Sequence, residues 1–184
     1  MKVDYIIIHH TGAEEKNAAQ VKRYHLGLGW RDIGYHFVIE RSGLIVAGRT
    51  GQGAHCTAND MNTHSIGIAL IGDFTKREPT KEQLDSLFIL ISREGLKYDI
   101  PCEKILGHKE VKGASTACPG NLNMVAVRAH YKENKQPSFA PSVHPSALYR
   151  VQVGAFRKEE NAQKQVKELK SKGINALIKP PYIY

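Results

Sequence analysis

Several features are scarce or missing in this chain of 184 residues. Its purely aliphatic runs are short, such as the three isoleucines at 6–8, whereas a membrane-spanning helix needs about 20 apolar residues. The three cysteines, Cys56, Cys102 and Cys118, include no C-x-x-C pair, so neither a disulfide framework nor a zinc ribbon is indicated. No basic and apolar leader precedes the first strand-like segment, so we expect no export signal. Together these absences argue against membrane insertion and a disulfide-stapled fold.

Acidic residues are outnumbered, because 18 Asp and Glu stand against 26 Lys and Arg, for a net charge of +8. Such an excess attracts polyanions, which include nucleic acid, anionic lipid and the acidic polymers of cell walls. No basic-aromatic stripe or RNA-binding motif accompanies the charge, so we expect no nucleic acid partner. Much of the excess lies in a carboxy-terminal group of lysines: Lys158, Lys164, Lys167, Lys170, Lys172 and Lys179.

A segment rich in proline and serine divides the sequence. Residues 134–147 contain three prolines and three serines, a composition that suits neither a helix nor a central strand. We therefore predict a linker at 134–147, a larger domain at 1–133 and a small unit at 148–184.

The first domain mixes short apolar runs with amphipathic segments. Apolar runs predict strands at 3–9, 35–40, 44–48 and 65–71. Helical spacing predicts helices that include 21–28, 84–91 and 124–131, and the sequence TKEQ at 80–83 fits a capping box. Strands that alternate with helices predict an α/β domain with a central mixed sheet.

The small carboxy-terminal unit has a β-α-β pattern. Residues 149–154 alternate as a strand, 161–172 form a helix with Ala162, Val166 and Leu169 facing inward, and 174–178 form a second strand. A unit of this size is marginally stable alone.

Histidine is the most informative residue type, with nine copies. Two places concentrate metal-capable groups, namely His9 with His10 after an apolar run, and His108 with Cys118 across a Gly- and Ser-containing loop. Imidazole and thiolate are zinc ligands, and a catalytic zinc needs three protein ligands with one open position. The alternative is that the histidines are hydrogen-bonded strand ends and Cys118 a small buried residue.

Seven separated blocks carry a family resemblance: IIHHT at 7–11, GWRDIGYHF at 29–37, AGR at 47–49, GAH at 53–55, NTHSIGI at 62–68, GHKEV at 107–111 and TACPG at 116–120. They resemble the successive motifs of the type 2 N-acetylmuramoyl-L-alanine amidases, a family that includes phage amidases and the animal peptidoglycan recognition proteins. The match is in the family's order and covers about residues 1–133.

The resemblance implies a Zn²⁺ ion held by His9, His108 and Cys118, with His10 as a neighbour. Tyr35 matches the family tyrosine whose hydroxyl lies near the scissile carbonyl.

Thr116 matches a position that is lysine in some phage members, and threonine donates a hydrogen bond without the positive charge. The proton for the leaving amine is expected from a tyrosine or from His36.

Other matching positions are expected to bind substrate. His55 and Asn62 align with the wall of the groove for sugar and stem peptide, and His36 is assigned to the same groove. The alternative for His36, His55 and His64 is a hydrogen-bonded wall residue. Arg49 is expected to contact a stem-peptide carboxylate, with a structural ion pair as the alternative. Trp30, the single tryptophan, is expected in the core rather than at the sugar.

The carboxy-terminal unit resembles the first half of a sporulation-related (SPOR) repeat, a module that binds peptidoglycan glycan strands. Because one β-α-β unit stands where the repeat has two, we expect it to complete itself as a homodimer or by packing on the amidase domain. Its alternative is a tail with a solvated basic helix.

The expected function is a zinc-dependent peptidoglycan hydrolase that cuts the amide between N-acetylmuramic acid and L-alanine, as an endolysin released at lysis or as an autolysin. Two alternatives remain open from the residues. One is a recognition protein that binds peptidoglycan without cutting it, a branch in which the cysteine ligand is typically missing. The other is a peptidase with Cys118 as nucleophile.

Overall fold

The structure is a computed structural model that describes residues 2–135 and 159–171. The chain forms two compact units, residues 1–140 and 141–184. Within the described ranges, no helix combines the length and apolarity that a membrane crossing needs.

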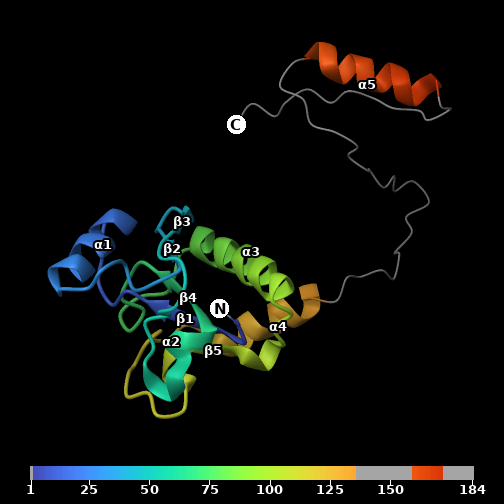
Figure 1. The fold of residues 1–184 in the computed structure, drawn as a ribbon. Coiled ribbons are helices and arrows are strands. Elements are labelled where there is room, and N and C mark those ends of the chain that lie inside the picture. Colours follow the sequence, from blue (N-terminus) through green and yellow to red (C-terminus); the bar gives the residue numbers. More distant parts are fainter. Residues whose placement is uncertain (1, 136–158, 172–184) are drawn as a thin grey trace. The chain divides into compact units, whose positions relative to one another are not determined.

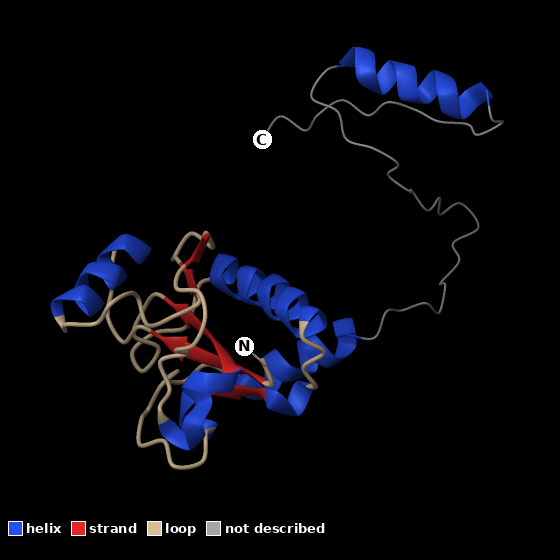
Figure 2. Cartoon of the chain, in the orientation of Figure 1, coloured by secondary structure: helices blue, strands red, loops and turns tan. Residues whose placement is uncertain are grey.

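A five-stranded mixed sheet lies at the centre of the first unit (Figure 1). The strand order is β3–β2–β4–β1–β5, so β1 (Tyr5–His10) lies between β4 (Ser65–Leu70) and β5 (Ile105–Gly107). β1 pairs in parallel with both neighbours, and β4 pairs in parallel with β2 (Phe37–Ile39). Only β3 (Ile45–Ala47) runs antiparallel, against β2. The mixed sheet and flanking helices confirm the predicted α/β class (Figure 2).

The apolar run of β1 is buried because helices and loops cover both faces of the sheet. Successive side chains of a strand point to opposite faces. Ile6 and Ile8 therefore join one core cluster, whereas Ile7 joins another with Cys56 and Met61. All three isoleucines are fully buried, as expected for a parallel strand that is covered on both sides.

Two helices, α3 (Lys81–Lys97) and α4 (Met124–Lys135), cover one face of the sheet (Figure 1). The predicted capping box starts α3, because Thr80 Oγ1 accepts from the Gln83 N–H and Gln83 Oε1 accepts from the Thr80 N–H, both at 3.1 Å. The main core forms where buried side chains of the two helices meet the even-numbered residues of β1 and β4. The helices contribute, among others, Leu87, Leu90, Ile91, Val127 and Tyr131.

The opposite face is covered by α1 (Ala18–Gly27) and by a segment that contains α2 (Met61–His64). Asn17 caps α1 by accepting the Gln20 N–H at 3.0 Å. Val21 of α1 packs with Val38 and Ala69. This face carries the functional site, because the odd-numbered side chains of β1 point toward it.

The structure differs from the sequence expectation at short elements and at one boundary. The three-residue strand β5, the four-residue helix α2 and three short 3₁₀ turns at 58–60, 102–104 and 108–110 are absent from the predicted pattern. Helix α4 continues to Lys135, two residues into the predicted linker. The first proline of that segment is Pro137. A proline disfavours the helical conformation of the residue before it, so it does not prevent the helix from reaching Lys135.

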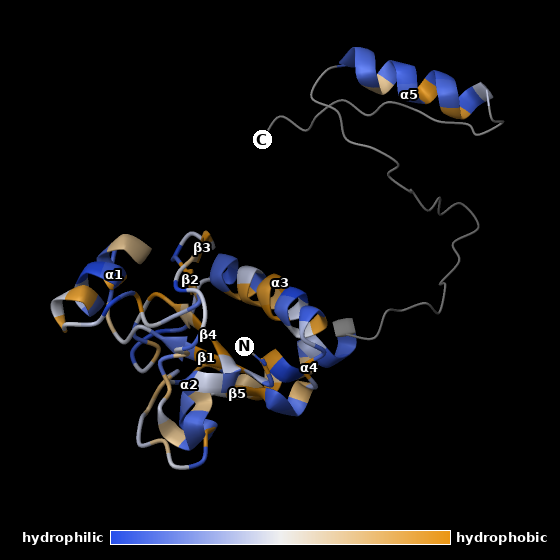
Figure 3. Cartoon of the chain, viewed as in Figure 1, coloured by the Kyte–Doolittle hydropathy of each residue, from blue (hydrophilic) through white to orange (hydrophobic). Residues whose placement is uncertain are grey.

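In the second unit the structure describes one helix, α5 (Glu159–Ser171). Ala162, Val166 and Leu169 are half-buried, while most other side chains of the helix are exposed, and Figure 3 shows a mainly hydrophilic helix with a few apolar positions. The predicted strands at 149–154 and 174–178, and linker residues 136–147, lie outside the described residues.

We expect Gly95→Ala in α3 to destabilise the domain. Alanine in a helix is favoured over glycine by about 1 kcal/mol, but a Cβ here would meet the Tyr131 hydroxyl oxygen and lie 2.6 Å from Cζ of the same ring. Tyr131 is fully buried and donates to the Ile100 carbonyl at 2.7 Å, so the ring has little room to move. Overpacking of this kind costs about 1 to 3 kcal/mol, so urea unfolding should report a net loss.

Gly27→Ala in α1 is the matched control, because no atom lies within 4 Å of the added Cβ. This variant should be neutral or more stable by up to about 1 kcal/mol. A Gly95→Ala protein as stable as the Gly27→Ala protein would contradict the packing described for α3 and α4.

Candidate metal centre

The two histidines that end β1 point to opposite faces of the sheet. His10 Nδ1 accepts the Phe74 N–H at 2.9 Å, and Phe74 belongs to the core under α3 and α4. His9 is fully buried and pairs in register with Ala69, on the face covered by α1. Strand alternation therefore separates the two imidazoles and makes His9 the candidate ligand.

His108 reaches His9 through the pairing of β1 with β5. The parallel register places Ile8 opposite Gly107, and His108 is the next residue after Gly107. The ring centroids of His9 and His108 lie 4.7 Å apart. Two histidines that are 99 positions apart in the numbering thus become neighbours at the carboxyl ends of adjacent parallel strands.

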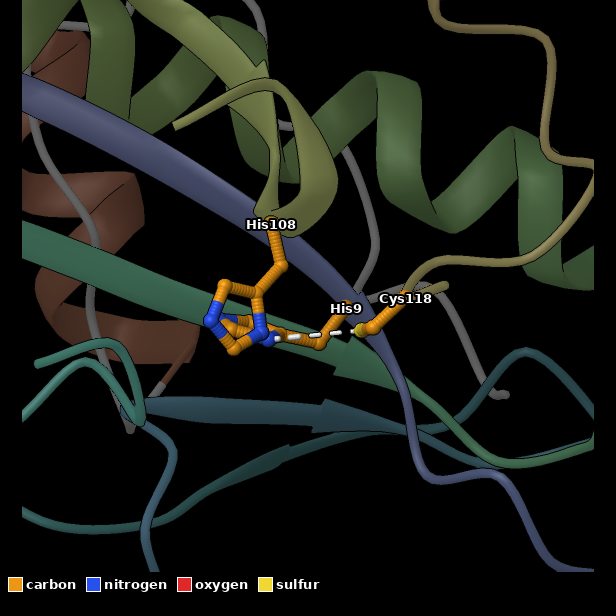
Figure 4. Close-up of side chains that lie close together, drawn as sticks. All are labelled: His9, His108 and Cys118. Carbon is orange, nitrogen blue, oxygen red and sulfur yellow. Dashed lines mark hydrogen bonds between the residues drawn. The ribbon is translucent and has the colours of Figure 1, made fainter. Parts of the chain in front are cut away.

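Cys118 completes the cluster from the loop that follows β5 (Figure 4). Its Sγ lies 3.6 Å from His9 Nδ1 and accepts the His10 N–H at 3.4 Å. The Cys118 carbonyl accepts the Lys109 N–H at 2.6 Å, which ties this loop to the segment that carries His108. The thiol is therefore held against the end of β1.

The three residues present one ligand atom each within 4.8 Å of one another, and they are the only such group in residues 2–135 and 159–171. His9 Nε2 is buried and has no hydrogen-bond partner among the described residues. Two imidazoles and a thiolate form a donor set typical of zinc. The His9 nitrogen that faces the Cys118 sulfur is Nδ1, so Nδ1 is the atom that His9 offers to a cation, and Nε2 is the other ring nitrogen.

Burial sets the protonation states of the cluster. It lowers the pKa of His9 well below the ordinary range, with a further contribution from nearby His108 and His55. Burial also lowers the pKa of His108 and raises the pKa of the Cys118 thiol to about 12. Both imidazoles are therefore neutral at pH 7, the form that binds metals, and a thiolate here needs a cation beside it.

Tyr35 and His55 form the wall next to the cluster. The Tyr35 ring centroid lies 5.3 Å from that of His9 and 4.7 Å from that of His55. The His55 ring lies 5.7 Å from that of His9. Burial raises the pKa of Tyr35 far above its ordinary value, so its hydroxyl stays protonated. Burial and neighbouring histidines lower the pKa of His55 to about 4.

His55 adopts an unusual backbone conformation. Its φ is +57°, in the left-handed region that non-glycine residues seldom occupy. Asn62 fixes the surrounding loop, because its Oδ1 accepts the Cys56 N–H at 3.0 Å and its carbonyl accepts the Gly53 N–H at 2.8 Å. Asn62, expected at the substrate, therefore acts on the loop that presents His55. Non-glycine strain of this kind is typical of functional sites.

His36 lies near the site but has no free ring nitrogen. Its Nε2 donates to the Gly51 carbonyl at 2.7 Å, and its Nδ1 accepts the Gly67 N–H at 3.0 Å. This geometry fits the hydrogen bonds of a structural residue better than a contact with substrate.

Arg49 and Thr116 keep groups available for a ligand. The structure shows no ion pair for the half-buried Arg49 within the described ranges, and its buried Nε lacks a hydrogen-bond partner there. Thr116 is exposed, and its hydroxyl oxygen accepts the Cys118 N–H at 3.1 Å. That bond uses the oxygen and leaves the hydroxyl hydrogen free to donate.

The ion pair between Glu110 and Arg128, which was not expected from the sequence, holds the backbone next to His108. Glu110 Oε2 accepts from the Gly107 N–H at 2.8 Å and from Arg128 Nη1 at 2.7 Å, while Oε1 accepts from Arg128 Nη2 at 2.9 Å. Arg128 also donates to the Ile105 carbonyl at 3.1 Å. Residues on both sides of His108 are thereby fixed to α4. Only the capping position of Glu110, three residues after Gly107, could have signalled this role.

The fold and the cluster together define an α/β domain with a candidate His–His–Cys metal site at the carboxyl end of its central strand. Comparison with protein families matches residues 1–121 to the N-acetylmuramoyl-L-alanine amidase family and residues 145–183 to the SPOR domain. The chain belongs to this amidase family and carries a SPOR domain, as the sequence resemblance indicated.

Known relatives include both amidases and recognition proteins. The chain is 34% identical to peptidoglycan-recognition protein LB of Drosophila melanogaster, over 78% of this chain and 70% of the relative. It is 31% identical to the endolysin of Escherichia phage T7, over 63% of this chain and 80% of that protein. The solved amidase LysC from Clostridium intestinale aligns with a TM-score of 0.64 and 33% identity, over 73% of this chain and 87% of that structure.

We expect Glu110→Gln to destabilise the domain by about 2 kcal/mol, because charge-assisted hydrogen bonds contribute about 1.5 to 3 kcal/mol each. Both partners are less than one third exposed, so solvent weakens the pair only in part. Urea unfolding measures the change. Lys81→Met is the control, because it breaks the exposed Lys81–Asp85 pair of α3 and should leave the midpoint unchanged. Equal midpoints for the two variants would contradict the supporting role of Glu110.

Proposed function

We propose that the chain is a zinc-dependent N-acetylmuramoyl-L-alanine amidase that hydrolyses the amide between the lactyl group of N-acetylmuramic acid and L-alanine in peptidoglycan. The observation that carries this proposal is the convergence of His9, His108 and Cys118, whose ligand atoms lie within 4.8 Å of one another. Membership of the amidase family and the similarity to an endolysin support the substrate.

Zn²⁺, held by His9, His108 and Cys118, would supply Lewis acidity that polarises an amide carbonyl and acidifies water. The chain contributes neutral imidazoles for this purpose, because burial lowers the pKa of both histidines. Glu110 and Arg128 contribute indirectly, since they fix the backbone on either side of His108.

Tyr35 and Thr116 are the proposed hydrogen-bond donors to the carbonyl oxygen as negative charge develops there. Burial keeps the Tyr35 hydroxyl protonated, and the Cys118 N–H orients the Thr116 hydroxyl. Donors that are placed before the reaction act without reorganisation, and the loss of one typically costs 10²- to 10³-fold in rate.

The leaving amine needs a proton, for which the sequence suggested a tyrosine or His36. His36 uses both ring nitrogens in hydrogen bonds to Gly51 and Gly67. Of the two candidates, we therefore assign this proton transfer to Tyr35. His55 is neutral at pH 7 and lines the same wall, where we propose that it contacts the substrate.

Arg49 is the proposed contact for a stem-peptide carboxylate, because its guanidinium has no ion pair among the described residues. The SPOR domain is proposed to hold the enzyme on glycan strands. Both proposed roles support an action at the bacterial cell wall, as an endolysin or autolysin.

Two other functions were open from the sequence. Binding without cleavage is supported by the similarity to recognition proteins, but Cys118 completes a three-ligand set that binding alone does not require. The contact of 3.6 Å between His9 and Cys118 also suits a cysteine nucleophile. That reaction needs a thiol of lowered pKa, whereas burial raises the pKa of Cys118 to about 12.

Cys118→Ser should abolish both zinc retention and cleavage while it leaves binding to cell walls intact. Serine replaces a strong thiolate ligand by a weak hydroxyl. The measurements are zinc content by elemental analysis and mass spectrometry of muropeptides, which detects new alanine amino termini. Cys102→Ser is the matched control, because Cys102 lies outside the cluster, and this variant should behave like the unchanged protein.

Chelation separates the remaining possibilities. A zinc amidase loses cleavage with chelator and regains it with added zinc. Cleavage that survives complete removal of zinc would indicate the cysteine nucleophile. Stoichiometric zinc without release of alanine termini would indicate a recognition protein.

Tyr35→Phe should lower kcat by about 10²- to 10³-fold, as expected for the loss of one preorganised donor, and should leave zinc content unchanged. The rate of muropeptide release measures the effect. Tyr98→Phe is the control, because Tyr98 lies at the end of α3 on the other side of the sheet. If Tyr35→Phe retained full activity, its hydroxyl would have no part in the reaction.

A further inference from the structure

His10 is a buried residue that the proposed reaction does not use. It ends β1 beside His9, and 9% of its surface is exposed. Its Nδ1 accepts the Phe74 N–H at 2.9 Å, across 64 positions of the sequence. A buried N–H that loses its acceptor destabilises a protein, so this bond fixes the end of β1 to the loop that follows β4.

Phe74 is also the place where the Cys118 loop, residues 112–121, touches the rest of the domain. The Phe74 carbonyl accepts the Asn121 N–H at 2.8 Å. Gly120 lies so close that an added Cβ would stand 2.5 Å from the carbonyl carbon of Phe74. Phe74 is therefore held by His10 through its N–H and carries the end of the Cys118 loop through its carbonyl.

The sulfur of Cys118 depends on how this loop is placed. Sγ accepts the His10 N–H at 3.4 Å and lies 3.7 Å from the His10 carbonyl oxygen. Most of residues 112–117 are exposed, and segments with little buried contact open easily. Lys109 Nζ donates to the Gly120 carbonyl at 2.5 Å, but the lysine itself is exposed. The buried support of the loop runs through Phe74.

We propose that His10 is a positioning residue for Cys118. By holding Phe74, its imidazole places the Cys118 loop so that the sulfur stands beside His9. The inference rests on the proposed function, in which Cys118 is a zinc ligand. Groups that orient a metal ligand from outside the ligand set typically contribute 10- to 100-fold to metal affinity. The second histidine of the pair thereby acts on the site without binding the metal.

The first test compares His10→Ala with His10→Asn in the full-length protein. Asparagine offers a carbonyl oxygen as an acceptor in place of Nδ1, whereas alanine offers none. Zinc affinity is measured by competition with a chelator. His10→Ala should raise the Kd for zinc by about 10- to 100-fold, and His10→Asn should restore most of that loss. An unchanged Kd in His10→Ala, or an equal loss in both variants, would overturn the proposal.

A pair of glycines tests the same contact from the loop. Gly120→Ala forces a Cβ against the backbone of Phe74, at a φ of +67°. Gly113→Ala is the matched control, because its φ is +85° in the same loop and no atom lies within 4 Å of the added Cβ. Gly120→Ala should therefore weaken zinc binding as His10→Ala does, and Gly113→Ala should not. Equal zinc affinities in the two glycine variants would count against the contact with Phe74.

The reaction of Cys118 with a thiol reagent in zinc-free protein gives a readout that needs neither metal nor substrate. In a Cys102→Ser background, Cys118 is the one thiol that is not fully buried, because Cys56 is enclosed in the core. His10→Ala should raise the reaction rate several-fold. Gly95→Ala controls for lost stability alone and should leave the rate unchanged.

The two proposals fail in different ways. A faster thiol reaction in His10→Ala, in a protein that binds no zinc and cleaves no peptidoglycan, would retain the positioning role and refute the amidase. Zinc-dependent cleavage with the same zinc affinity and thiol reactivity in His10→Ala as in the unchanged protein would retain the amidase and refute the positioning role.

Discussion

The site depends on the parallel pairing of β1 with its two neighbours. Because β4 and β5 run in the same direction as β1, the carboxyl ends of three strands meet at one edge of the sheet. The β1–β5 register sets His108 beside His9, and the pleat turns His10 away into the core. A shift of one residue in that register would exchange the faces of His9 and His10, so the fully buried isoleucines at 6–8 also protect the site.

Patterns within one element could be predicted from the sequence, and contacts between elements could not. The capping box at Thr80 and the apolar spacing of α3 are local, and the structure retains both. The three residues of β5 carry no alternation of their own, and they form a strand because β1 pairs with them. Trp30 is apolar and lies between a helix and a strand, which suggested the core. The structure instead leaves 38% of its surface exposed and stacks the ring on His25, a contact that no local pattern encodes.

In the candidate site, too, contacts between elements could not be predicted from local sequence patterns. Spacing alone left His9 and His10 equivalent, and the choice of His9 came from resemblance to a family. The pleat of β1 now gives the physical reason. The family resemblance predicted that Asn62 contacts substrate, and it gave Glu110 no role, yet each accepts a backbone N–H of a loop that carries a site residue. Such supporting residues are recognised only when the loops they hold have been placed, because their partners are backbone atoms distant from substrate.

The electrostatics of the site explain why a thiolate belongs among otherwise neutral groups. Burial keeps the rings of His9, His55 and His108 uncharged, so these three imidazoles bring no positive charge to the centre. A divalent cation that is bound by two neutral imidazoles and one thiolate retains a single net positive charge. An oxyanion beside such a cation would gain an attraction that a second anionic ligand would cancel, and low-dielectric surroundings would strengthen this attraction. The proposed donor set would therefore hold the cation and still leave positive charge for the transition state.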